Sequence, residues 1–393
     1  MKKICIIAAI IVVLAVVFMF VSNITPRSDE NERESDSFYT MDLGCFASAG
    51  VEQLLETEET LYYLCSTPGG ETRLYFSDKS NKEWLPLCGK PNCLHSTEDC
   101  ESVLEGNASN KVWLYGSHIY YLVRTEESRG PELWRMKLDG SSHEKLCTPF
   151  ENAKNTGAMY SYDWYFHNKY AIVLYYTLDS EETGGQTQAY KLDLGAKEIE
   201  AVKLEIPDGI SLGNPVAGCG NMLFCVCGDE DEPKLVKTDL DSGETQILHE
   251  LPFIPELYSC VYHDGCIIFA EGWEQGKIYR FDVENDVLEI LASAEPETRR
   301  WYYPSGNYVF GSNSSRVSPF AGTEISDLSG NLVWESKPSD EIPEIGIGSM
   351  IGDYVFGYEN GENRITIEHL PTWYLDIREI GTDCFGWHRW GND

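Results

Sequence analysis

The tetrapeptide Tyr-Val-Phe-Gly occurs at 308–311 and again at 354–357. Two related apolar runs come earlier, and a turn pair precedes each of the four runs. These pairs are Gly220-Asn221, Asp264-Gly265, Gly306-Asn307 and Gly352-Asp353, which start 44, 42 and 46 residues apart. A Gly, Asn or Asp pair followed by a short aromatic and β-branched run is typical of a tight turn that leads into a strand. The spacing therefore indicates a repeated strand hairpin.

Looser copies of the same unit lie nearer the N-terminus, at 61–64, 119–122 and 171–174, so that the repeat is expected seven times. Most copies continue into a second run that ends in a turn. The aligned second runs are Trp134–Gly140, Tyr190–Gly195, Val236–Asp241 and Tyr279–Glu284, with Asp78 and Asp327 at the same place in two further copies. Beyond Phe38 we find no long stretch of helical period, so the body is predicted to be all-β.

A strand repeat of this period is typical of a β-propeller, in which each blade is a four-stranded antiparallel sheet. Residues 38–393 divided by seven leave about 51 residues per blade, enough for four short strands and their loops. We expect seven blades, with eight as the alternative; paired sandwiches or a solenoid would share the strand count but not the need for closure.

Closure of the ring is expected to place strands from both ends of the chain in one blade. The candidate segments are Phe38–Met41 or Glu52–Leu55 near the N-terminus, and Trp373–Ile380 with Phe385–Trp390 near the C-terminus. On this hypothesis, deletion of 381–393 prevents stable folding.

The unit at 119–141, which contains Ile-Tyr-Tyr and Leu-Trp-Arg-Met-Lys-Leu-Asp-Gly-Ser, resembles the YWTD-type repeats of extracytoplasmic propellers. The Cys/His stretch at 88–100 is similar to one in bacterial cell-envelope propeller proteins of unknown function. The resemblance covers 58–380 as a pattern and implies a fold, without implying receptor-type ligand recognition.

The first segment is predicted to be a transmembrane anchor. Met1-Lys2-Lys3 precedes an uncharged apolar run from Ile4 to Ser22 that is long enough, at about 28 Å as a helix, to cross a bilayer once. A cleaved signal peptide is the competing interpretation, but the run exceeds the usual apolar core of a signal and lacks a small-x-small cleavage site. Cys45 lies too far downstream of the run to be a lipidation site.

Lys2 and Lys3 are expected to stay in the cytoplasm, so that residues 1–22 form a single-pass anchor and the C-terminal body lies outside the cell membrane. Residues 23–37 are polar and acidic and are expected to form a flexible tether. The predicted organisation is therefore an anchor at 1–22, a tether at 23–37 and an extracytoplasmic propeller at 38–393.

Composition excludes some classes of function. The chain has 30 Lys and Arg against 64 Asp and Glu, and the formal charge of -34 repels nucleic acid. The sequence has no H-E-x-x-H, phosphate loop, G-x-S-x-G elbow or dinucleotide fingerprint. Enzyme activity is therefore not predicted, although a propeller could still assemble a site from scattered loops.

The strongest local motif is Cys88-Gly-Lys-Pro-Asn-Cys93-Leu-His95-Ser-Thr-Glu-Asp-Cys100, an expected insertion between the first two blades. Three thiols and one imidazole can surround a tetrahedral zinc ion. Disulfides are the favoured alternative because thiols outside the cytoplasm tend to oxidise. Cys260 with Cys266, and Cys219 with Cys225, are further candidates for cross-strand disulfides, whereas Cys225 and Cys227 could also be free core residues.

Two other features have a structural and a functional interpretation. Asp239, Asp241 and the acidic loop 228–232 could hold Ca²⁺, but such loops are more often simply solvated. The aromatic runs 160–166 and 301–303 could stack on sugars, but more often form strand core.

The sequence thus predicts a membrane-anchored binding or interaction module of the cell envelope, with an envelope protein or a glycan as its ligand. The alternative is a carbohydrate-active hydrolase or lyase, which would need two carboxylates from different blades about 5–10 Å apart. A sensor ectodomain is a third option, which would signal through a membrane partner.

Overall fold

The computed structural model describes residues 53–66, 71–95, 99–104, 112–123, 132–149, 159–178, 186–206, 215–228, 232–255, 260–271, 277–293, 301–305, 307–312, 324–335, 345–351, 354–359, 373–376 and 387–389. The chain divides into two compact units, Met1–Ser37 and Phe38–Asp393. The predicted anchor and tether lie outside the described residues. Within the described ranges, no helix has the length and apolar character needed to cross a membrane.

The second unit is built from antiparallel sheets, which we name A to G in chain order. Sheet A contains β1 (Gln53–Glu56), β2 (Thr60–Ser66), β3 (Thr72–Asp78), β4 (Leu85–Pro86) and β5 (Val103–Leu104). Sheet B contains β6 (Val112–Tyr115), β7 (His118–Val123), β8 (Glu132–Lys137) and β9 (Glu144–Cys147), and sheet C contains β10 (Met159–His167), β11 (Tyr170–Leu178), β12 (Gln186–Asp193) and β13 (Val202–Lys203). Sheet D contains β14 (Pro215–Cys219), β15 (Met222–Cys227), β16 (Lys234–Asp239) and β17 (Thr245–Glu250), and sheet E contains β18 (Cys260–His263), β19 (Cys266–Ala270), β20 (Lys277–Asp282) and β21 (Val287–Ser293). Sheet F contains β22 (Trp301–Ser305), β23 (Tyr308–Ser312), β24 (Glu324–Asp327) and β25 (Leu332–Glu335), and sheet G contains β26 (Ile345–Ile351), β27 (Tyr354–Glu359), β28 (Trp373–Asp376) and β29 (Trp387–Arg389).

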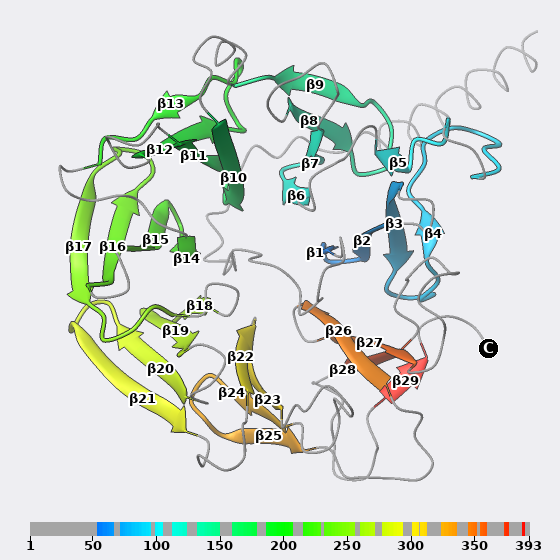
Figure 1. Ribbon diagram of the computed structural model, residues 1–393. Helices are drawn as coiled ribbons and strands as arrows, with labels where there is room; N and C mark the ends of the chain where they lie inside the picture. The colour runs from blue at the N-terminus through cyan, green and yellow to red at the C-terminus, as the bar shows by residue number, and fades with distance from the viewer. Residues whose placement is uncertain are drawn as a thin grey trace, which may run out of the picture. The chain divides into compact units, whose positions relative to one another are not determined.

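The sheets follow one another around a ring, with the first strand of each nearest the centre and the last at the rim (Figure 1). This is a β-propeller, and the apolar runs quoted above are the second strands of its sheets. The expectation of seven equivalent four-stranded blades, or eight, is wrong: among the described residues only six sheets, B to G, have the four-stranded order. Sheet A departs from it because a fifth strand, β5, pairs with β3.

Sheets A to E each bury both of their faces against their neighbours, and this explains the continuous apolar runs. On β11, Ala171 and Val173 pack into the cluster shared with sheet B, whereas Ile172 and Leu174 pack into the cluster shared with sheet D. All four side chains are fully buried. Because successive strand residues face opposite sides, an alternating polar pattern would leave polar groups in one of the two cores.

The ends of the chain meet by packing and not through a shared sheet. Sheets A and G each take their described strands from one end of the chain only, so the expected mixed closing blade is wrong. Instead, β1 lies against β26. A buried cluster of Leu61, Tyr63 and Tyr75 from sheet A with Tyr354 and Tyr374 from sheet G completes the contact.

The closing contact has a polar component at its edge. The Lys82 ammonium donates a hydrogen bond to the Tyr374 hydroxyl and lies 4.1 Å from the centre of the Tyr374 ring. Cation–π attraction therefore adds to the apolar packing between sheets A and G.

Truncation of Tyr374 tests this closure. Tyr374 is 5% exposed, and Tyr374→Ala should lower the free energy of unfolding by about 3–5 kcal/mol because it leaves a cavity at the closing contact. Tyr374→Phe keeps the ring and should cost about 1 kcal/mol, the value of one hydrogen bond. Denaturant titration of the two variants measures both values; equal stabilities of Tyr374→Ala and the parent would contradict closure at this contact.

Aspartates close the turns between the third and fourth strands. The Oδ1 atoms of Asp78, Asp193, Asp239, Asp282 and Asp327 each accept a hydrogen bond from the backbone N–H two residues later, at 2.7–3.0 Å. The aligned second runs had marked these five positions. In sheet B the same bond is made two residues further along, by Asp139 to the Ser141 N–H at 2.9 Å.

These turn bonds make stability depend on pH. The side chain and backbone N–H of Asn285 hydrogen-bond to Asp282 and hold the pKa of its carboxyl below the ordinary value. The pKa values of Asp78 and Asp139 are lowered by the bonds that they accept from Ser80 and Ser141. A lowered folded-state pKa contributes stability above the unfolded pKa of about 3.9, and the contribution is lost as pH falls through the folded value.

Asp282→Asn tests this effect. An asparagine Oδ1 can still accept the turn bond but cannot be protonated in this range, so the loss of stability below about pH 4 should be smaller than in the parent. The measurement is the thermal midpoint from pH 7 to pH 3. Asp163→Asn, an exposed position on β10, is the control and should follow the parent; identical acid profiles for Asp282→Asn and Asp163→Asn would contradict the assignment.

Candidate metal centre and loop face

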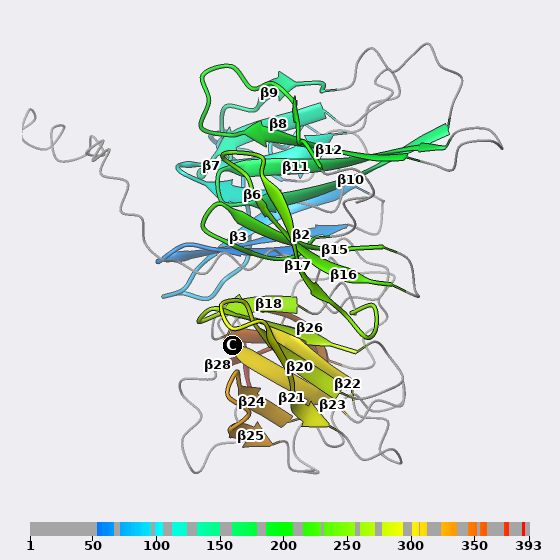
Figure 2. The same cartoon turned by 90° about the vertical axis from the view of Figure 1, so that its left-hand side faces the viewer.

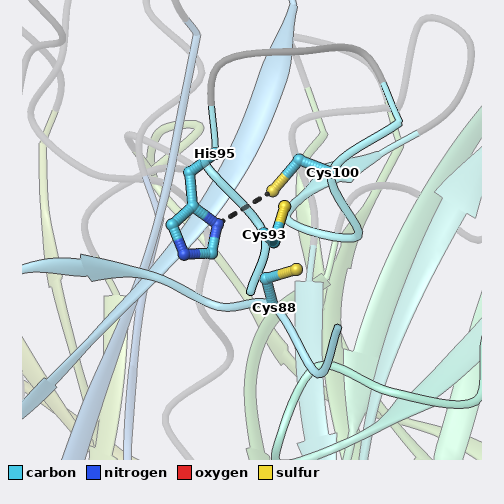
Figure 3. A group of neighbouring side chains, drawn as sticks. All are labelled: Cys88, Cys93, His95 and Cys100. Atoms are coloured by element: carbon cyan, nitrogen blue, oxygen red, sulfur yellow. Dashed lines mark hydrogen bonds between the residues drawn. The ribbon is translucent and has the colours of Figure 1, made fainter. Parts of the chain in front are cut away.

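The structure brings together the four side chains of the Cys/His motif. The Sγ atoms of Cys88, Cys93 and Cys100 and a ring nitrogen of His95 all lie within 4.8 Å of one another (Figure 3). His95 Nδ1 is 3.3 Å from Cys100 Sγ. A tetrahedral zinc ion, with Zn–S of about 2.3 Å and Zn–N of about 2.0–2.1 Å, holds its donors roughly 3.5–3.8 Å apart. The cluster therefore has close to the dimensions of a four-coordinate site.

The motif interrupts the outer strand of sheet A. Both β4 and β5 pair antiparallel with β3, β4 at Tyr75 and Phe76 and β5 at Thr72 and Arg73. Leu74 lies between these pairs and bonds to both sides of the gap: its carbonyl accepts from the Leu87 N–H and its N–H donates to the Ser102 carbonyl, each at 2.9 Å. The chain thus leaves the edge of β3 after Leu87 and returns to it at Ser102, both times opposite Leu74. The motif therefore lies within sheet A, and the expectation of an insertion between the first two blades is wrong.

Three other sheets, B, D and E, have a β-bulge at the equivalent position. Leu74 lies four residues before the end of its strand, as do Leu133 on β8, Leu235 on β16 and Ile278 on β20. The register of the fourth strand shifts at each of these three residues. A bulge leaves one residue unpaired and loosens the ladder locally. The Cys/His loop therefore occupies a point where the propeller's outer strand is already irregular.

Contacts with β3 hold the loop in shape. The Arg73 side chain, which is 10% exposed, donates through Nη1 to the His95 carbonyl at 2.8 Å and is paired with Glu71 at 3.0 Å. Asn92 and His95 have left-handed φ values of 58° and 55°, which direct the chain back between the cysteines. Cys100 is buried and its Sγ lies 3.0 Å from the Ser102 hydroxyl.

The electrostatics of the cluster favour a cation. Burial acts to raise the pKa of the Cys88 thiol, but hydrogen bonds from the backbone of Lys90 and Glu101 outweigh it and the pKa lies below its ordinary value. Burial raises the pKa of Cys100, with the neighbouring thiols acting in the same direction. The Glu101 Oε2 atom is also shielded from solvent and has no hydrogen-bond partner among the described residues. Such a buried oxygen calls for a compensating group.

The donor set identifies the kind of metal that fits. Thiolate sulfur and imidazole nitrogen in a four-coordinate arrangement suit Zn²⁺, whereas Ca²⁺ and Mg²⁺ require oxygen ligands. Four protein donors leave no open position for a substrate, which is the arrangement of a structural zinc site and not of a catalytic one.

Disulfides, the favoured alternative, are not supported. Cys88, Cys93 and Cys100 are free thiols, as are the other cysteines whose side chains the structure describes, namely Cys147, Cys219, Cys225, Cys227, Cys260 and Cys266. The two cross-strand pairs expected from sequence fail because of register.

Cys260 is opposite Phe269 and Cys266 is opposite His263. Cys219 is opposite Met222. Cys225 and Cys227 are instead buried in the core between sheets C and D, the alternative that the sequence left open for them.

The oxygen atoms of Asp239 and Asp241 are used in protein contacts. Asp239 accepts the backbone N–H groups of Asp241 and Ser242 at 2.8 and 2.9 Å. Asp241 accepts hydrogen bonds from Tyr170 and Asn221 and lies 3.6 Å from the Lys169 ammonium. These contacts tie sheet D to sheet C and leave no basis for the Ca²⁺ hypothesis at this turn.

The aromatic run on β10 is core where the structure describes its side chains. Trp164 and Phe166 are 4% and 5% exposed and pack between sheets B and C. Residues 301–303 form part of β22, and their side chains lie outside the described residues.

Strand direction places the first-to-second turns on one face of the ring and the second-to-third connections on the other. First and second strands are joined by two or three residues, from 57–59 in sheet A to 352–353 in sheet G. Second and third strands are joined by five to thirteen residues, and successive sheets by seven to eleven. Because neighbouring strands are antiparallel, these two kinds of connection start from one face of the ring, which we call the loop face; β11 and β12 run out to it in Figure 2. The opposite face carries the first-to-second turns and the third-to-fourth connections, which have four to ten residues.

Sequence reasoning found the four donors but missed the residues that position them. The contribution of Arg73 depends on pairing between β3 and the loop, which no local pattern reveals. The left-handed conformation of Asn92 had a signal, since Pro-Asn pairs favour turns. The break in the outer strand opposite Leu74 had none, because register is set by long-range pairing.

These observations define the class of the protein as a β-propeller with a Cys₃His cluster at one outer strand. No family model matches the chain, and no curated protein matches it. Solved structures with a similar fold include a prolyl endopeptidase, at 11% identity over 86% of this chain and 49% of that one with a TM-score of 0.53. A puromycin hydrolase matches at 14% identity over 89% of this chain and 54% of that one, with a TM-score of 0.52. A puromycin-hydrolyzing peptidase of Mycobacterium tuberculosis matches at 12% identity over 86% and 53%, with a TM-score of 0.51.

The chain spans about half the length of these structures, and identities this low show the fold alone. The comparisons support the propeller fold and do not confirm YWTD-type repeats.

Close packing between the Cys/His loop and sheet B gives a test. Gly140, in the β8–β9 turn, has a φ of 77°, and a Cβ added there would lie 2.6 Å from the Leu87 carbonyl oxygen. Gly116 has a φ of 58° with no atom that close to its Cβ position, so Gly116→Ala is a matched control for backbone strain. Gly140→Ala should lose about 1–3 kcal/mol more stability than Gly116→Ala, through overpacking. Denaturant midpoints compare the two; equal losses would contradict the packing of the loop on sheet B.

Proposed function

We propose that the protein is a membrane-anchored binding module of the cell envelope. Residues 1–22 would anchor it with a cytoplasmic N-terminus, residues 23–37 would form a tether, and the propeller would lie outside and bind an envelope protein or a glycan. The anchor part of the proposal rests on the apolar run after Met1-Lys2-Lys3.

One observation carries the binding part. The loop face has second-to-third connections of five to thirteen residues and inter-sheet connections of seven to eleven. The opposite face has first-to-second turns of two or three residues and third-to-fourth connections of four to ten residues, most of them closed by an aspartate. Connections on a rigid scaffold are where proteins place recognition residues. The loop face therefore supports ligand binding better than the turn face does.

The hydrolytic activities named for the similar structures are not carried over, because the chain spans about half their length and is 11–14% identical to them. A carbohydrate-active hydrolase or lyase is kept as an outcome of the test.

The test is a binding screen of the full chain in detergent micelles against envelope glycans and envelope proteins. A loop-face variant, Asp229→Asn/Glu230→Gln/Asp231→Asn, neutralises three carboxylates between β15 and β16. Its matched control neutralises three exposed carboxylates in turns of the other face, Glu198→Gln/Glu200→Gln/Glu284→Gln.

We expect a ligand that is bound by the parent and the control and at least tenfold more weakly by the loop-face variant. Loss of binding in the control alone would place the site on the other face. Turnover of a polysaccharide by the parent would replace the binding proposal with the hydrolase alternative.

A further inference from the structure

Three thiols and one imidazole converge at a break in the outer strand of sheet A. The break separates β4 from β5, and only Leu74 of β3 bonds to both sides of it. Two-residue strands such as β4 and β5 make few ladder bonds. Something other than strand continuity must hold residues 87–102 to the edge of sheet A.

The four donors are placed where a shared ligand would hold the loop to the edge of sheet A. Cys88 comes two residues after β4 ends and Cys100 three residues before β5 begins, so a ligand shared by these two residues joins both sides of the break. Cys93 and His95 come from the middle of the loop and close the remaining two positions of the cluster. A metal ion bound by all four residues would fix the loop at its two ends and at its centre.

Three contacts outside the cluster hold the donors in place. The buried Arg73 side chain fixes the His95 carbonyl, Ser102 contacts Cys100, and the loop packs against the β8–β9 turn through Gly89, whose Cβ position lies 2.7 Å from Ser141 Cβ. Preorganised donors of this kind are typical of a resident structural metal.

We infer that Cys88, Cys93, His95 and Cys100 bind one Zn²⁺ ion, and that this ion joins the two halves of the split outer strand of sheet A. In sheets B, D and E the fourth strand continues past its bulge as one strand, whereas in sheet A the ion would connect two separate strands. It has no catalytic part, because four protein ligands fill its tetrahedral shell. The inference is independent of the envelope-binding proposal, since it concerns the outer rim and not the loop face.

Metal analysis of the purified full chain is the first test. We expect one zinc per chain after purification without chelators, and the visible absorption of tetrahedral thiolate-bound cobalt when Co²⁺ replaces zinc. Cys93→Ser should lose most of the bound zinc, whereas Cys147→Ala, which removes a thiol on β9, should keep it. Three free thiols without metal, or a disulfide within 88–100 without metal, would overturn the inference.

Hydrogen exchange tests the structural role and does not depend on a variant that folds. A chelator added to the parent chain should accelerate exchange of the Leu74, Leu87 and Val103 amides at least tenfold. The bulged outer strands of sheets D and E are the internal control and should not change. Bound zinc whose removal leaves exchange at these amides unaltered would overturn the role assigned to it.

Discussion

The fold depends on burial of both faces of each sheet. The second strands carry uninterrupted apolar runs, so each sheet must find an apolar partner on both sides. On β15, Leu223 and Cys225 face sheet C, while Phe224 and Val226 face sheet E. A linear stack would leave one apolar face uncovered at each end. The contact of β1 with β26 removes that cost by bringing the first sheet against the last.

Features with local causes could be predicted from the sequence. Tight turn pairs and apolar runs located the second strands, and the aligned aspartates marked turns whose geometry requires an acceptor at that position. The proximity of the four metal-ligand candidates at 88–100 also had a local cause, because side chains within one short loop lie close together. These predictions required no knowledge of which strands pair across the fold.

Features set by long-range register could not be predicted. A register three residues away would place Cys260 opposite Cys266, whereas the observed register pairs Cys260 with Phe269. The same limit explains why the Cys/His loop was expected between blades when it lies within sheet A, opposite Leu74. Closure by packing was missed because a cluster such as Tyr63 with Tyr374 joins residues more than 300 positions apart.

The bulges at Leu133, Leu235 and Ile278 lie at the position where sheet A carries the inserted Cys/His loop, opposite Leu74. Each marks a place on the rim where the polypeptide could be lengthened without disturbing the inner three strands that carry the core. An engineer could graft a foreign peptide at any of them, and evolution could do the same by duplication and drift. The outer strands of the ring therefore offer several positions for an insertion, and the Cys/His loop opposite Leu74 occupies one of them.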